Sequence, residues 1–118
     1  MYPEKKRADD KAMFDDVVNA ILSVMGDDAV KIILYGSVAR GDNTWESDVD
    51  IAVLTTKHYD WKARKELYDS LWEYDLKYDT LFSIVPIPEA EFNRIMNEKL
   101  FYRNILKDGM TLWTKNTA

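Results

Sequence analysis

Residues 36–54 of this 118-residue chain read GSVARGDNTWESDVDIAVL, and this stretch decides how the rest of the sequence is interpreted. It begins with Gly36 and Ser37, which directly follow the apolar run VKIILY. It ends in a second apolar run, which opens with Asp48 and Asp50. Carboxylates are poor strand formers. Their position at the start of a strand therefore calls for a physical explanation.

The segments around this stretch alternate between helical and extended patterns. Helices are predicted at residues 9–25, 59–76 and, as one or two helices, 88–107; strands are predicted at residues 30–35, 48–55, 78–87 and 110–113. In the helix at 59–76, the predicted inward positions are Trp61, Leu67, Leu71 and Trp72. This order predicts an α/β (α+β) fold, in which a small mixed sheet is flanked by helices.

Composition narrows the class of protein. A length of 118 residues predicts a single domain over residues 1–118, and 47% hydrophobic with 31% charged residues is typical of a globular chain. The absence of cysteine excludes disulfides and thiolate metal sites. A net charge of -5 argues against a broad nucleic-acid surface. Apolar runs are far shorter than the roughly 20 residues of a membrane span, so we expect a soluble, cytoplasmic protein.

Asp48 and Asp50 are spaced so that a strand would place both carboxylates on one face. At a rise of about 3.3 Å per residue, their backbones lie roughly 6–7 Å apart. Val49 and Ile51 would then face the core. Two ionised carboxylates repel each other, so either one binds a proton or a cation lies between them. Carboxylate oxygens suit Mg²⁺, whereas a single histidine and no cysteine make a zinc site a poor fit.

Gly36 and Ser37 offer the complementary half of a site. Glycine lets a ligand approach the backbone closely, and free N–H groups with a hydroxyl donor favour an anion such as phosphate. If the two strands are neighbours, phosphate and metal would share one nucleotide site. Each feature alone also has an ordinary structural explanation. Gly-Ser suits a turn, Asp-x-Asp suits a solvated strand edge, and Arg40 suits a surface ion pair.

The combination is more specific than its parts. Gly36-Ser37, ten intervening residues that include Arg40, and Asp48-Val49-Asp50 resemble the signature of the nucleotidyltransferase superfamily typified by DNA polymerase beta. The small size is similar to that of its minimal nucleotidyltransferase branch, whose members are often encoded beside a HEPN-domain partner. The resemblance implies the nucleotidyltransferase (polymerase beta palm-like) fold.

The resemblance also implies a set of site residues. A third carboxylate is expected on an adjacent strand, where Asp79 is the candidate and Asp75 the alternative. Asp48, Asp50 and Asp79 would then hold two Mg²⁺ ions about 3.5–4 Å apart. Gly36 and Ser37 would hold the phosphates of ATP, and Arg40 would either neutralise the leaving pyrophosphate or brace the loop.

The function implied by the resemblance is transfer of AMP from ATP to a protein hydroxyl. The implied acceptor is a tyrosine of a HEPN toxin, with this chain as the antitoxin, in a homo-dimer or a hetero-oligomer. Two alternatives stay open: an antitoxin that neutralises its partner by binding alone, and a transferase that acts on a small aminoglycoside-like hydroxyl. Trp45, within the motif, is either a loop anchor or a contact to the base or partner.

Overall fold

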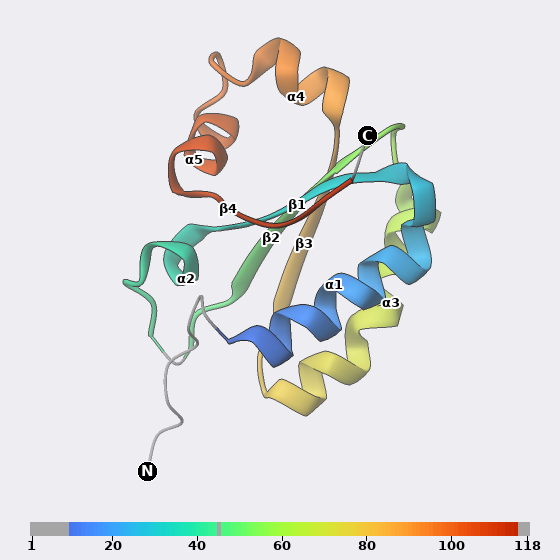
Figure 1. Ribbon diagram of the computed structural model, residues 1–118, viewed down its shortest axis with the longest axis vertical. Coiled ribbons are helices and arrows are strands. Elements are labelled where there is room, and N and C mark those ends of the chain that lie inside the picture. Colours follow the sequence, from blue (N-terminus) through green and yellow to red (C-terminus); the bar gives the residue numbers. More distant parts are fainter. Residues whose placement is uncertain (1–9, 45, 116–118) are drawn as a thin grey trace.

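The computed structural model describes residues 10–44 and 46–115, which form a four-stranded sheet with helices on both faces (Figure 1). The elements follow one another as α1 (Lys11–Met25), the short 3-10 helix η1 (Gly26–Asp28), β1 (Ala29–Tyr35), α2 (Gly36–Arg40), β2 (Val49–Thr55), α3 (Trp61–Tyr78), β3 (Phe82–Pro88), α4 (Glu89–Ile95), α5 (Leu100–Asp108) and β4 (Met110–Thr114). The predicted fold class, a small mixed sheet flanked by helices, is confirmed.

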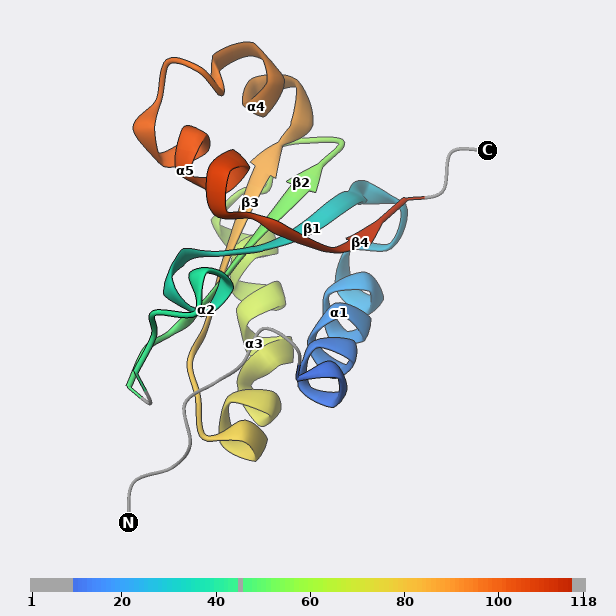
Figure 2. The same cartoon turned by 60° about the vertical axis from the view of Figure 1, so that its left-hand side comes forward.

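The strand order is β3-β2-β1-β4. β1 pairs antiparallel with β2 and β4, whereas β2 and β3 run parallel. A parallel pair requires a crossover connection, and α3 supplies it. Figure 2 shows α1 and α3 on one side of the sheet and α4 and α5 on the other. The sheet is therefore the middle layer of three.

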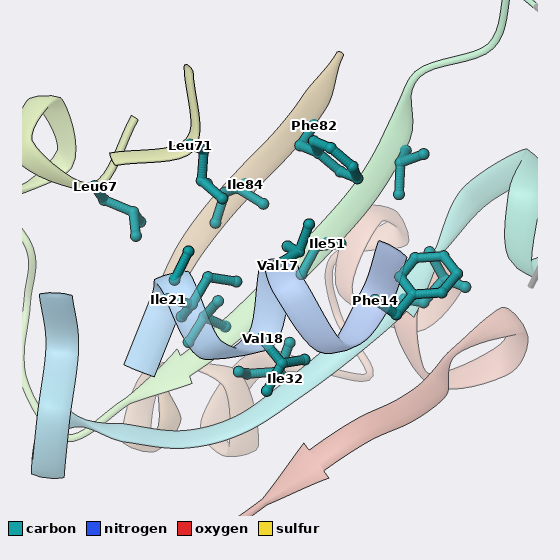
Figure 3. Close-up of a cluster of buried hydrophobic side chains, with 14 of the residues drawn as sticks. Phe14, Val17, Val18, Ile21, Ile32, Ile51, Leu67, Leu71, Phe82 and Ile84 are labelled. Carbon is teal, nitrogen blue, oxygen red and sulfur yellow. The ribbon is translucent and has the colours of Figure 1, made fainter. Parts of the chain in front are cut away.

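Both faces of the sheet are packed, and each strand alternates between them. On one face, buried aliphatic residues of the strands, among them Ile32, Ile51 and Ile84, pack against Val17 and Ile21 of α1 and against Leu67 and Leu71 of α3 (Figure 3). On the other face, Ile33, Ala52, Leu54 and Ile87 pack with Phe92 of α4 and Ile105 of α5. Each fully buried aliphatic side chain contributes about 1.5–3 kcal/mol to the free energy of folding, relative to an exposed one. A slip of one residue would reverse every side chain, so this packing fixes the register.

The third strand begins later than predicted. α3 continues to Tyr78 and ends at Asp79, whose left-handed backbone (φ 46°) forms the helix C-cap. β3 then starts at Phe82 rather than at residue 78. The expectation that Asp79 stands at the start of the third strand is therefore wrong.

The face of α3 that meets the core is narrower than predicted. Leu67 and Leu71 are buried, but Trp61 and Trp72 are 70% and 64% exposed, so these two inward assignments are wrong. At 100° per residue, Leu67 and Leu71 form one stripe, and both tryptophans fall on a neighbouring stripe of the helix. Within residues 10–44 and 46–115, no helix has the length and apolar character needed to cross a membrane.

A polar contact joins the end of α3 to α1. The hydroxyl of Tyr78 donates to the Asp16 carboxylate, and Nζ of Lys77 lies 3.1 Å from the same carboxylate. The Tyr78 hydroxyl, followed by Lys77, lowers the pKa of Asp16 below its ordinary value of 3.8. This contact fastens the C-terminal turn of α3, which is the turn that carries the chain past Asp79.

We expect Asp16→Asn to destabilise the protein at neutral pH. Because the pKa of Asp16 is lower in the folded state, its contribution is complete above the unfolded pKa and is lost as the pH falls through the folded pKa. Urea unfolding at pH 7 should show the difference between variant and wild type, and unfolding below pH 3 should show it shrinking. Asp15→Asn, which removes a neighbouring carboxylate paired with Lys11, is the control. A difference that is constant with pH would contradict the contact.

Candidate active site

The antiparallel pairing of β1 with β2 brings the two halves of the motif together. Tyr35, the last residue of β1, lies opposite Asp50 of β2. Gly36 and Ser37 follow Tyr35 directly and begin α2, while Asp48 lies immediately before β2. Residues separated by more than ten positions in sequence thus become neighbours at one end of the sheet. The expected adjacency of the two strands is confirmed.

Gly36 is in contact with the Asp50 carboxylate, and this contact requires glycine. Its φ of +77° lies in the left-handed region. A Cβ placed on Gly36 would lie 3.2 Å from Cγ of Asp50 and would overlap its Oδ2. The Asp50 side chain therefore occupies the space that any larger residue would need. The motif glycine fixes where the second carboxylate sits.

The site brings two acidic side chains, Asp48 and Asp50, close to each other. Burial, and then the nearby Asp48, raise the pKa of Asp50, while Arg40 acts in the opposite direction. Asp48 is exposed and Asp50 is half-buried. Val49 and Ile51, the residues between and after them, are fully buried in the core, as predicted. The two carboxylates thus form a pair to which a cation would be attracted.

Two site neighbours were not predicted from the sequence. Tyr35 lies beside Asp50, and burial, followed by the Asp50 charge, raises its pKa to about 12, so its hydroxyl is protonated at neutral pH. Its ring packs edge-on against Phe101, with centroids 5.7 Å apart. On the other side of Asp50, the paired residue of β3 is Ser83. Both are polar residues within apolar strands, and this pattern in the sequence could have indicated them as site residues.

Arg40 braces the site from the side. Its guanidinium lies 3.1 Å from Asp42 in the motif loop and 3.1 Å from Asp108 at the end of α5. These two ion pairs match the bracing role that the sequence left open. Its assignment to nucleotide binding stays a prediction.

The loop between the two motif halves is closed by short-range hydrogen bonds. The carbonyl of Ser37 accepts the backbone N–H of Asp42 at 3.1 Å. Further on, Oγ of Ser47 accepts the backbone N–H of Thr44 at 2.9 Å. Trp45, for which a loop or ligand contact was considered, lies outside the described residues. The loop thus returns the chain from α2 to Asp48.

The third carboxylate does not join the pair. Asp79 lies in the C-cap of α3, before β3 begins. Asp75, the alternative, accepts the backbone N–H of Phe82 at 3.2 Å, and burial raises its pKa. Among residues 10–44 and 46–115, no three His, Cys, Asp or Glu residues are grouped so that they could hold a metal ion. The expected convergence of Asp48, Asp50 and Asp79 is therefore not found.

The Asp48 and Asp50 carboxylates are a donor set that fits magnesium. Magnesium keeps several waters and is commonly bound by one or two carboxylates together with substrate phosphates. Asp48 and Asp50 supply such a pair, and burial, followed by the Asp48 charge, raises the pKa of Asp50.

Comparison with known proteins shows the family to which the chain belongs. The family model described as "Polymerase beta, Nucleotidyltransferase" matches residues 19–118. Two chains of Methanocaldococcus jannaschii, each named as a putative protein adenylyltransferase, are similar in sequence. One is 36% identical over 98 residues, which cover 83% of this chain and 92% of that relative. The other is 38% identical over 63 residues, or 53% of this chain and 64% of that relative.

Solved structures share the fold. A chain in the crystal structure of a toxin-antitoxin with AMP-PNP superposes with a TM-score of 0.61 at 23% identity and covers 86% of this chain and 74% of that chain. A chain in the structure of a tri-AMPylated Shewanella oneidensis HEPN toxin with MNT antitoxin has a TM-score of 0.59 at 20% identity, with coverages of 89% and 72%. At these identities, the likeness shows the fold.

We expect Gly36→Ala to destabilise the protein more than Gly41→Ala. Both glycines have left-handed backbones (φ +77° and +79°), so each substitution adds strain of about 1–2 kcal/mol. At Gly41 a Cβ meets nothing within 4 Å, whereas at Gly36 it overlaps the Asp50 carboxylate. Urea unfolding of both variants at the same pH measures the difference. Equal losses would show that Asp50 does not pack on Gly36.

Proposed function

The chain belongs to the polymerase beta family of nucleotidyltransferases, and from this membership we propose that it transfers AMP from ATP to a hydroxyl of a partner protein. The proposed acceptor is a tyrosine of a HEPN toxin, so that the chain acts as an antitoxin. One observation carries the proposal: the Asp50 carboxylate lies against Gly36 of the Gly-Ser turn, with Asp48 beside it. A nucleotidyltransferase needs this meeting of acidic oxygens with a phosphate-accessible backbone.

The choice of a protein acceptor is supported by the relatives. The two archaeal relatives carry the name of protein adenylyltransferase, and one of them matches along 83% of this chain. The structural neighbours include a toxin-antitoxin with AMP-PNP and a complex whose HEPN toxin is tri-AMPylated. We propose that residues 1–118 act as a single minimal domain in the cytoplasm, to which the acceptor binds from outside.

In the proposed reaction, the acceptor hydroxyl oxygen attacks the α-phosphorus of ATP in line, pyrophosphate leaves as the bond from the α-phosphorus breaks, and the hydroxyl proton passes to solvent. Gly36 and Ser37 would hold the β- and γ-phosphates, because the turn after β1 exposes its backbone beside Asp50. Asp48 and Asp50 would hold one Mg²⁺ that, when bound, neutralises phosphate charge. Tyr35 stays protonated at neutral pH and keeps a hydrogen-bond donor at the floor of the site. Catalysis by such a site consists mainly of positioning and charge stabilisation.

Replacing both carboxylates should abolish transfer and leave the fold intact. With Asp48→Asn and Asp50→Asn together, we expect no labelling of a HEPN-domain protein by [α-³²P]ATP and Mg²⁺, against clear labelling by wild type. With [γ-³²P]ATP, neither wild type nor the double variant should label the HEPN-domain protein, because the γ-phosphate leaves as part of pyrophosphate. The raised pKa of Asp50 means that its charge opposes folding at neutral pH, so the variant should be at least as stable as wild type in urea.

The same experiment separates the enzyme from an antitoxin that acts by binding alone. If the double variant labels the acceptor like wild type, these residues are not the catalytic pair. If wild type forms a stable complex with the HEPN-domain protein but transfers no label, and the double variant does the same, the chain neutralises its partner by contact. Size-exclusion chromatography of each mixture reports complex formation independently of label.

Arg40→Ala and Asp108→Asn should have small and similar effects. Exposed ion pairs contribute about 0–1 kcal/mol, so loss of the brace should raise the KM for ATP by no more than about fivefold in either variant. Steady-state kinetics with varied ATP makes the comparison. A loss of about a hundredfold or more in Arg40→Ala, with Asp108→Asn unchanged, would instead place Arg40 on the phosphates.

A further inference from the structure

The strand pairing places Ser83 next to Asp50. β2 and β3 run parallel in a register in which Asp50 pairs with Ser83, while Asp50 pairs with Tyr35 on its other side. Tyr35, Asp50 and Ser83 therefore form a row across three strands. Paired residues of neighbouring strands are about 4.8 Å apart and share a face. Ser83 is thus the β3 residue nearest to Asp50 on that face.

The burial pattern of β3 agrees with this orientation. Phe82 and Ile84 are buried in the core beneath α1 and α3. Since side chains alternate along a strand, Ser83 between them lies on the opposite face, which is also the face of Asp50. Ser83 is half-buried. A longer acidic side chain at this position would therefore extend beside the Asp50 carboxylate.

The acidic residues that precede β3 do not form a group of three with Asp48 and Asp50 among residues 10–44 and 46–115. Asp79 lies four residues before Ser83, in the left-handed cap of α3. Asp75 holds the backbone N–H of Phe82 on the side of β3 away from β2. Two ions bound about 3.5–4 Å apart require ligands on both. In the part of the chain that the structure describes, no third acidic residue joins Asp48 and Asp50 in such a group.

From this arrangement we infer that the chain binds a single divalent cation with its nucleotide, and that Ser83 occupies the position from which a carboxylate would hold a second one. The inference rests on the proposed function, because it assumes that nucleotide binds at Gly36 and Asp50. Because Ser83 is uncharged, no protein carboxylate binds a cation on the side of the site where the acceptor hydroxyl would lie. The number of cations that the site binds would then depend on whether residue 83 carries a carboxylate.

Electron paramagnetic resonance with Mn²⁺ and a non-hydrolysable ATP analogue tests the inference without measuring activity. Two Mn²⁺ ions about 3.5–4 Å apart give a spin-coupled spectrum, whereas one ion gives the spectrum of an isolated centre. We expect wild type to bind one isolated Mn²⁺ per nucleotide. Ser83→Asp should bind two, with a coupled spectrum. Ser83→Asn, which is similar in size and neutral, and Ser23→Asp, which adds the same charge on an exposed position of α1, should both resemble wild type.

Each outcome has one meaning. A coupled pair in wild type overturns the inference and leaves the proposed function standing. A single isolated ion in folded Ser83→Asp overturns the position assigned to Ser83. If wild type binds neither the nucleotide analogue nor Mn²⁺, the proposed function fails, and the inference fails with it. Circular dichroism of each variant shows whether it is folded.

Discussion

The contact between Gly36 and the Asp50 carboxylate is the constraint on which the rest of the site depends. It exists because β1 and β2 pair in one register, with Tyr35 opposite Asp50. That register is held by packing on both faces of the sheet, where Ile32 and Ile33, adjacent in sequence, belong to opposite cores. A shift of one residue would turn the acidic side chain toward the core beneath α1 and α3 and would exchange the aliphatic side chains between the two cores. The same strand register therefore sets both the packing of the core and the geometry of the charged site.

Most of the fold could be predicted from local patterns. The β-branched run of β1, the motif and the helical spacing of α1 each carry their structure in a few neighbouring residues, and Val49 and Ile51 face the core as alternation requires. The end of α3 could not be predicted this way, because its last turn is held by Asp16 of α1, more than sixty residues earlier. Asp79 follows directly, as the C-cap of the same helix.

The candidate site was predictable in the half that lies within one continuous motif. The half contributed by β3 depends on the register of a parallel pair, and no turn connects such strands to reveal it. Ser83 nevertheless left a trace, since it is the hydroxyl residue between the two buried apolar residues Phe82 and Ile84. The expectation of a third carboxylate favoured Asp79 instead. Ser83 lies on the face of Asp50, whereas Asp79 precedes the strand.

β3 is an edge strand of the sheet, and the direction of its backbone groups has a consequence for how other chains can attach. The N–H of Phe82 points outward and is bound by Asp75, so the nitrogens of Pro86 and Pro88, at the same alternation, point outward as well. Proline has no N–H to offer. An edge with so few outward donors is a poor template for strand addition, so the β3 edge resists pairing with other chains. Recognition along this border must therefore rely on side chains.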